Sequence, residues 1–328
     1  MSDNGNNDNV LEVRNLSVSY RSLRGTVRTL RHVDLTVPRH KVVGIVGESG
    51  CGKSTLINTL LRLLAPNAII DGGTVSFQGT DVLQMTDDEL RDLRGQKVSM
   101  VFQDPMTALN PVITIGTQMV DILYRLDTSN AEKKRRAADM LRLVGIPDAV
   151  MRLDEYPHQF SGGMLQRICI AMALMMNPAL LIADEPTTAL DVTLEAQIIH
   201  LLRELKNSFD CSILFVSHNL GLIAELCDEV VVMYAGEVVE QGNVHDLFHH
   251  PQHPYTRMLL ECDPARIEKT GGELPTISGN VPDLIELPSG CIFAPRCPSA
   301  FAPCNDEPPG TYPIERGHTA RCFLFRHD

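Results

Sequence analysis

Residues 42–55 read VVGIVGESGCGKST, an apolar run that passes directly into a glycine-rich loop. Val42–Val46 has the continuous apolar pattern of a buried strand, and Thr55–Leu64 has the composition of a helix. Between them, Gly47–Ser54 fits the pattern G-x-x-x-x-G-K-[ST]. Glycines let backbone N–H groups turn inward around phosphate oxygens, and the start of the helix adds positive potential. The stretch predicts a phosphate-binding loop in an α/β fold, although a plain glycine-rich turn would have the same outline.

The side chains of this loop have separate predicted roles. Lys53 would reach the β- and γ-phosphates of a nucleotide, and the Ser54 hydroxyl would bind Mg²⁺. Cys51 occupies a variable position, where it is either an inert small residue or an oxidisable thiol that would block ATP. The residues predicted to contact the nucleotide are Gly47, Glu48, Ser49, Gly50, Cys51, Gly52, Lys53, Ser54 and Thr55.

Two adjacent carboxylates, Asp184 and Glu185, follow the apolar run Leu180–Ala183. A parallel sheet binds its ligands at the carboxyl ends of its strands. Asp184 is predicted to hold Mg²⁺, directly or through water, and Glu185 to polarise an attacking water. Such a pair is also common in a solvated turn or at a helix start. Its occurrence together with the phosphate loop favours the catalytic interpretation.

Strand-like and helical segments alternate from Leu11 to Leu260. Apolar strands flanked by helices are typical of a sheet covered on both faces. Ala235-Gly236 predicts a hairpin turn, and Thr193–Lys206 predicts an amphipathic helix. The strand-like runs are Val98–Phe102, Leu180–Ala183, Ile213–Val216 and Val230–Met233.

Further motifs resemble those of the ABC ATPase family, in the family's order. Phe160–Met164, which reads FSGGM, is similar to the LSGGQ signature, with Phe160 in place of Leu and Met164 in place of Gln. Gln103 matches the Q-loop and Asp191 the D-loop. Each motif is weak alone, since a single Gln or Asp is usually structural, but the ordered set is specific.

Two more residues complete the resemblance. His218 follows an apolar strand as the switch histidine does, and Tyr20 matches the aromatic residue that stacks on adenine. The resemblance implies that His218 contacts the γ-phosphate and helps to orient Glu185 and the water. It also implies that Gln103 senses Mg²⁺, contributes to catalysis and links the site to a helical subdomain at about residues 104–175.

The fold implied by this resemblance is a P-loop (RecA-like) ABC ATPase core with antiparallel β and helical subdomains. Two ATP-binding subunits would enclose two ATP molecules head to tail. Ser161, Gly162 and Gly163, at a predicted helix N-terminus, would contact the γ-phosphate bound to the opposite subunit. The resemblance also implies that Asp191 contacts the nucleotide.

The character of the chain changes near residue 262. Residues 262–328 are rich in Pro, Gly and Cys, so we predict an ATPase domain over 1–261 and a small Cys-rich extension over 262–328. His253–Thr256 and Pro288–Cys297 resemble segments of ATPases from oligopeptide, dipeptide and nickel importers. That resemblance implies ATP-driven import, most simply of peptides, with nickel or another small solute as the alternative.

Four of the nine cysteines crowd into the last 38 residues. Their spacing, C-x₅-C-x₆-C-x₁₇-C, supplies enough thiolates for a [4Fe–4S] cluster or a tetrahedral zinc, and four unliganded thiols are the remaining alternative. The absence of C-x₂-C pairs favours iron–sulfur, which the resemblance also implies. The predicted ligands are Cys291, Cys297, Cys304 and Cys322.

Composition restricts the surroundings of the chain. A net charge of −12 argues against general nucleic-acid binding, and no apolar run is long enough to cross a bilayer. The polar N-terminus does not resemble a signal peptide, which places the chain in the cytosol. The resemblance implies a peripheral location on the cytoplasmic face of the inner membrane. Its implied partners are a second, non-identical ATPase subunit, two membrane permease subunits and an external substrate-binding protein.

Functions other than import fit the sequence less well. Soluble ABC ATPases of translation usually carry two such units in one chain, whereas this chain has one. ABC ATPases of DNA repair insert long coiled coils between the phosphate loop and the signature. In this chain the corresponding interval, from Lys53 to Ser161, has no such insertion. A regulatory protein that senses iron is disfavoured because Lys53, Glu185 and His218 are intact. An exporter subunit would not require the C-terminal segment.

Overall fold

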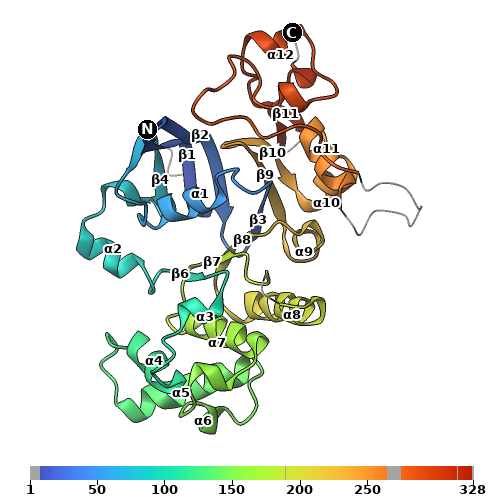
Figure 1. Ribbon diagram of the computed structural model, residues 1–328. Helices are drawn as coiled ribbons and strands as arrows, with labels where there is room; N and C mark the ends of the chain where they lie inside the picture. Colours follow the sequence, from blue (N-terminus) through green and yellow to red (C-terminus); the bar gives the residue numbers. More distant parts are fainter. Residues whose placement is uncertain (1–7, 189, 264–274, 316, 327–328) are drawn as a thin grey trace. The chain divides into compact units, whose positions relative to one another are not determined.

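A computed structural model describes residues 8–188, 190–263, 275–315 and 317–326. The chain divides into unit 1, residues 1–84 and 216–328, and unit 2, residues 85–215 (Figure 1). The expected absence of a signal peptide rests on the polar segment 1–9, of which residues 1–7 lie outside the described residues.

Unit 1 contains a four-stranded sheet with the order β2-β1-β4-β5. Its strands are antiparallel, and alternate side chains of β1 and β2 are buried on one face. The bounds are β1 Asn9–Ser22, β2 Gly25–Pro38, β4 Ala68–Phe77 and β5 Thr80–Asp81. Its apolar face includes Leu16, Val18, Leu30, Val33 and Val75, each at most 1% exposed.

A second group of strands in unit 1 has the order β11-β12-β10-β9-β3. β3 runs parallel to β9, whereas the remaining pairs are antiparallel. All five residues of β3 are buried, as the continuous apolar run predicts. The bounds are β3 Val42–Val46, β9 Glu229–Tyr234, β10 Glu237–Asn243, β11 Tyr312–Glu315 and β12 His318–Ala320.

The turn between β9 and β10 confirms the predicted hairpin. Ala235 and Gly236 both have positive φ, 44° and 88°, as a two-residue primed turn requires. A Cβ on Gly236 would lie 2.4 Å from the Thr29 carbonyl oxygen, so the close approach of β2 also requires glycine. β12 then pairs with β10, where Glu240 lies opposite Ala320. The C-terminal segment, residues 262–328, therefore extends the same sheet through β12. Its strands are too short for this pairing to be predicted from the sequence.

The helices of unit 1 are short. The helix after the glycine-rich loop is α1, Lys53–Leu60, which begins two residues before the predicted Thr55 because Gly52 serves as its N-cap. The other helices are α9 Leu220–Leu226, α10 Val244–His249, α11 Pro254–Glu261 and α12 Ala302–Asp306, with 3₁₀ turns at Val82–Gln84, Ala294–Arg296 and Phe323–Phe325.

Unit 2 combines three strands with a group of helices, coloured teal to yellow in Figure 1. Its strands have the order β8-β7-β6, and β6 runs parallel to β7. The strands are β6 Val98–Val101, β7 Leu180–Asp184 and β8 Ser212–Val216. The helices are α2 Asp87–Leu93, α3 Pro105–Ala108, α4 Ile115–Ile122, α5 Asn130–Leu143, α6 Ala149–Arg152, α7 Gly162–Leu174 and α8 Val192–Ser208, with a 3₁₀ turn at Pro157–Gln159.

The helix starts in unit 2 follow from their capping residues. Thr86 forms a capping box with Glu89 at α2, and Thr114 and Ser129 cap α4 and α5. The amphipathic helix predicted over Thr193–Lys206 is confirmed as α8, which is longer by one residue at its start and two at its end. Within the described ranges, none of the helices has the length and apolar character needed to span a bilayer.

Candidate functional site

The glycine-rich loop of unit 1 requires its glycines for steric reasons. Gly47 has φ 152°, and a Cβ there would lie 2.1 Å from the Met233 carbonyl oxygen. Gly52 has φ 105°, and a Cβ there would meet Leu30 Cδ2 at 2.7 Å. Gly50 has φ 82° with open space around it. The backbone is therefore held close to β9 and β2, and a phosphate group fits such a cradle.

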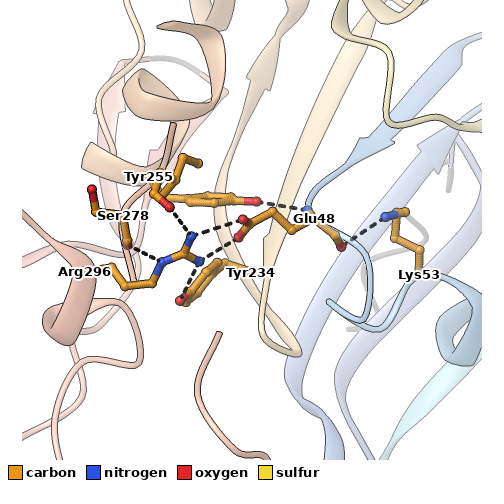
Figure 2. Close-up of polar contacts among 7 residues, drawn as sticks. Glu48, Lys53, Tyr234, Tyr255, Ser278 and Arg296 are labelled. Carbon is orange, nitrogen blue, oxygen red and sulfur yellow. Dashed lines mark hydrogen bonds and ion pairs between the residues drawn. The ribbon is translucent and has the colours of Figure 1, made fainter. Parts of the chain in front are cut away.

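Lys53 is folded back onto the loop. Its side chain is largely buried, with the residue 8% exposed. Nζ donates to the carbonyl oxygen of Gly47 at 2.7 Å. It also donates to the carbonyl oxygen of Glu48 at 3.3 Å (Figure 2). The ammonium group is thus held against the loop by carbonyl oxygens of the loop itself. Ser54 and Thr55 follow at the start of α1, where Ser54 is exposed.

Two other predicted residues of unit 1 lie on different elements. Tyr20 is on β1, and its hydroxyl is 3.4 Å from Thr55 Oγ1 at the start of α1. The structure therefore brings the predicted adenine-stacking residue close to the phosphate loop. His218 is exposed, in the segment that precedes α9.

The two carboxylates of unit 2 end β7. Asp184 is the last residue of the strand, and Glu185 follows with a positive φ of 46°, which is uncommon for a residue other than glycine. Glu185 Oε2 accepts hydrogen bonds from Gln103 Nε2 at 3.2 Å and from Thr188 Oγ1 at 3.0 Å. Gln103 is 82 positions away in the sequence, so the parallel strands β6 and β7 bring these predicted residues together.

The signature segment of unit 2 forms a helix start. Ser161 is the N-cap of α7, and its hydroxyl accepts a hydrogen bond from Met164 N at 3.4 Å. Gly162 and Gly163 are the first two residues of the helix, and a Cβ on Gly163 would lie 3.0 Å from Leu194. Ser161 and Gly162 are both exposed. An exposed helix start with small residues can accept an anion.

Asp191 is the N-cap of α8, as Ser161 is of α7. Its carboxylate accepts a hydrogen bond from Leu194 N at 2.9 Å and caps the helix. The D-loop aspartate therefore has a local structural role in this chain. The predicted contact of Asp191 with the nucleotide stays a prediction.

Comparisons with known proteins agree with the geometry of both units. The family model described as ABC transporter matches residues 30–188, and the one described as oligopeptide/dipeptide transporter, C-terminal region, matches residues 239–304. The chain is 46% identical over 319 residues to the dipeptide transport ATP-binding protein DppD of Bacillus subtilis, covering 97% of this chain and 95% of the relative. The chain belongs to the ABC transporter family.

Further relatives and solved structures agree with this assignment. The oligopeptide transport ATP-binding protein OppD of Salmonella typhimurium is 47% identical over 315 residues, 96% of this chain and 93% of the relative. The dimeric structure of a bacterial ABC transporter cassette matches with a TM-score of 0.63 at 29% identity, over 71% of this chain and 98% of that one. A cassette in a post-hydrolysis state bound to ADP and phosphate gives the same TM-score at 28% identity. The predicted α/β fold of an ABC ATPase is confirmed, and the chain is an ATPase that uses ATP and Mg²⁺.

The predicted [4Fe–4S] cluster is wrong. Among the side chains that the structure describes, the ABC ATPase has no group of three or more His, Cys, Asp or Glu residues that could hold a metal ion. Burial raises the pKa of Cys291 to about 11 and also raises the pKa of Cys297 and of Cys322. Cys304 contributes its carbonyl oxygen, which accepts a 2.8 Å hydrogen bond from Cys291 N.

Aromatic packing holds the C-terminal segment in place instead. Phe293 is 1% exposed, and its ring lies 5.0 Å from Tyr234, 5.4 Å from Tyr255 and 5.7 Å from His253. These residues come from β9 and the start of α11. Such contacts depend on shape and burial, which cysteine spacing does not report.

Truncation of this ring should destabilise the protein strongly. Phe293→Ala is expected to lower the free energy of unfolding by about 3–5 kcal/mol, because it leaves a cavity among three aromatic rings. Phe301 is a matched control in the same segment, since it is 42% exposed. Phe301→Ala should cost about 1 kcal/mol or less. Denaturant titration of both variants measures the difference, and equal losses would contradict the role given to Phe293.

Two polar contacts near the predicted site were not predicted. Thr188 donates to Glu185, and Arg296 forms an ion pair with Glu48 at 2.8 Å. Arg296 was not predicted to lie near the phosphate loop. One feature of the sequence could have indicated this ion pair: Glu48 places an acidic side chain within a loop that binds phosphate, and a nearby cation would offset its charge.

Proposed function

We propose that this chain is the ATP-hydrolysing subunit of an importer of peptides. The observation that carries the proposal is its similarity, over nearly its full length, to relatives named as dipeptide and oligopeptide transport ATP-binding proteins. The match to the oligopeptide/dipeptide C-terminal region supports the same branch, because a general ABC ATPase does not need that segment.

The loop of unit 1 is the proposed nucleotide site. The backbone N–H groups of Gly47–Thr55 face the phosphates, and Lys53 exchanges its bonds to the loop carbonyls for bonds to phosphate oxygens. Tyr20 stacks on the adenine. Ser54, Asp184 and Gln103 are the proposed holders of Mg²⁺, which offsets the charge on the phosphates when it is bound.

Glu185 is the proposed group that polarises the attacking water. Its Oε2 atom already accepts hydrogen bonds from Gln103 and Thr188, so the carboxylate has a defined orientation before ATP arrives. An oriented carboxylate loses less freedom when the water binds. Together with Gln103, His218 contributes to catalysis, through a contact with the γ-phosphate.

A second ATPase subunit supplies the other half of each site in this proposal. Ser161, Gly162 and Gly163 contact the γ-phosphate held by the opposite subunit, and Asp191 contacts the nucleotide as well. The exposure of Ser161 and Gly162 supports this role. The partner subunit is proposed to be a non-identical paralogue. ATP binding closes the pair and hydrolysis reopens it, because ATP binds the closed state more tightly.

The remaining assembly follows from this function. Two membrane permease subunits and an external substrate-binding protein are the proposed partners, and the chain lies peripherally on the cytoplasmic face of the membrane. We propose a nucleotide-binding domain over residues 1–261, with a helical subdomain at about 104–175, and an extension over 262–328. The ABC transporter model at 30–188 lies within the first of these domains, whereas the oligopeptide/dipeptide C-terminal model at 239–304 spans the proposed boundary.

The Ser161 hydroxyl gives a test of the two-subunit site. Ser161→Ala is expected to reduce ATP turnover at least about tenfold while leaving the ATP affinity of the isolated subunit unchanged, because the lost contact belongs to the opposite subunit's nucleotide. Ser129→Ala is the matched control, since Ser129 is also a serine N-cap in unit 2 and accepts from Glu132 N at 3.2 Å. That control should cost only about 1 kcal/mol of stability. Equal turnover in both variants would contradict the proposal.

Transport itself tests the proposed function. The chain would be reconstituted in proteoliposomes with its permease subunits, partner ATPase and substrate-binding protein, and uptake of labelled di- and oligopeptides would be measured with and without ATP. Uptake that needs both ATP and an intact Lys53 supports peptide import. ATP-driven uptake of nickel in place of peptides would reject the substrate, and ATP hydrolysis without any uptake would reject the transport function.

A further inference from the structure

The phosphate loop contains an acidic side chain, Glu48, directly after Gly47. A loop of this kind binds anions through backbone N–H groups and the positive end of a helix. A carboxylate in the same loop reduces that positive potential. Its negative charge also repels a bound phosphate, and the repulsion is stronger in a partly buried site than in water. The Glu48 side chain is 29% exposed, so solvent screens its charge only in part. The loop therefore needs a cation to neutralise Glu48.

Arg296 provides that cation from the C-terminal segment (Figure 2). Its Nη1 and Nη2 atoms donate to the two carboxylate oxygens of Glu48 at 2.8 Å and 3.1 Å, a bidentate pair. The Arg296 side chain is 4% exposed, and its hydrogen bonds to Glu48 raise its pKa further. The guanidinium is therefore charged at every physiological pH.

The other donors of the guanidinium are also used. Nε donates to the Ser278 carbonyl oxygen at 3.0 Å, Nη2 to that of Ile277 at 3.0 Å, and Nη1 to the Tyr234 hydroxyl at 3.3 Å. With the two bonds to Glu48, these contacts use all five N–H donors of an arginine. The guanidinium is thus fixed in position and orientation, which a surface ion pair does not require.

Glu48 passes this constraint to the rest of the loop through its backbone. Its N–H donates to the Tyr255 hydroxyl at 3.0 Å, and its carbonyl oxygen accepts from Lys53 Nζ at 3.3 Å. Tyr255 packs in turn against Phe293 of the C-terminal segment. The loop residue that binds Lys53 is therefore held at its side chain and at its backbone by contacts that include the C-terminal segment.

We propose that Arg296 is a positioning residue for the nucleotide loop, through which the C-terminal segment sets the affinity for ATP. The inference rests on the proposed role of the loop in binding phosphates. Arg296 acts in two ways: it neutralises Glu48, and it restricts the loop to the conformation that receives the triphosphate. A binding site that is competent only part of the time loses apparent affinity in proportion.

ATP binding to the full-length chain measures this effect. Titration with a fluorescent ATP analogue should show that Arg296→Ala raises Kd about 10- to 30-fold, because a charged, buried pair to the loop is lost. Arg296→Lys should give an intermediate Kd, since it keeps the charge but not the bidentate geometry. Arg326→Ala is the matched control, because Arg326 pairs with Glu307 at 3.0 Å in the same segment. The Arg326→Ala variant is expected to bind ATP with the wild-type Kd.

A double-mutant cycle separates positioning from a general structural role. When Glu48→Gln has already removed the carboxylate, adding Arg296→Ala should change Kd by no more than about twofold. A loss that remains about tenfold in that background means that Arg296 acts through the fold of the segment and overturns the proposal. A wild-type Kd for Arg296→Ala, with normal thermal unfolding, also overturns it.

A second variant covers the case in which Arg296→Ala fails to fold. Arg296→Lys, made alone and together with Glu48→Gln, then completes the cycle, with the same outcomes expected at smaller size. The proposal that the loop binds the phosphates of ATP is tested separately. It fails if Lys53→Ala binds ATP as tightly as the wild type, whatever the result for Arg296.

Discussion

Glu185→Gln is expected to reduce ATP turnover by about 100-fold or more while leaving ATP binding intact, because an amide cannot polarise water as a carboxylate does. The change is isosteric. Gln103 and Thr188 currently donate to Glu185 Oε2, and the new side chain retains an oxygen that can accept from them. The loss therefore measures chemistry and not misfolding.

Steady-state hydrolysis and binding of a fluorescent ATP analogue should be measured on the same preparation. Glu132→Gln is the matched control, since it makes the same change on an exposed helix of unit 2, where Glu132 pairs with Arg135 at 2.7 Å. Normal turnover by Glu185→Gln would overturn the catalytic assignment. Loss of ATP binding would instead show that the site collapses without the charge.

Lys53→Ala should weaken ATP binding by about 100-fold, since hydrogen bonds from a charged group contribute about 1.5–3 kcal/mol each. Lys53 is nearly buried, and its present acceptors are backbone carbonyl oxygens of the loop. Its ammonium group is therefore already desolvated, which strengthens its attraction to phosphate.

The control for this prediction is Lys41→Ala. Lys41 is also in unit 1 but is half exposed, 3.9 Å from Asp228, and removal of its charge should leave the Kd for ATP unchanged. Equilibrium titration at fixed salt compares the two variants, because salt screens exposed charges more strongly than buried ones. A Kd for Lys53→Ala within about twofold of wild type would contradict the role of the loop.

The sequence predicts those parts of the molecule that local patterns determine. The strand before the loop, the hairpin at Ala235-Gly236 and the helix α8 follow from runs of a few residues, and the structure confirms them. Helix starts were less accurate, because Gly52 caps α1 earlier than the apolar pattern suggests.

Contacts between distant segments were not predictable in the same way. Glu48 and Arg296 are 248 positions apart, and neither belongs to a periodic pattern that would bring them together. The cysteine spacing misled for a related reason. Spacing reports how many sulfurs are available, but the fold determines whether three or more ligands converge on one point, and the described residues form no such group.

The long separation of Glu48 and Arg296 has a consequence during synthesis. A ribosome releases the chain from its N-terminus, and domains form as their residues emerge. The loop is complete soon after translation begins, yet its arginine appears 248 residues later, and β12, which pairs with β10, later still. A chain that stops short would carry an intact phosphate loop with an unneutralised carboxylate. Such a fragment would bind ATP poorly, so interrupted synthesis would yield few subunits able to compete for a permease.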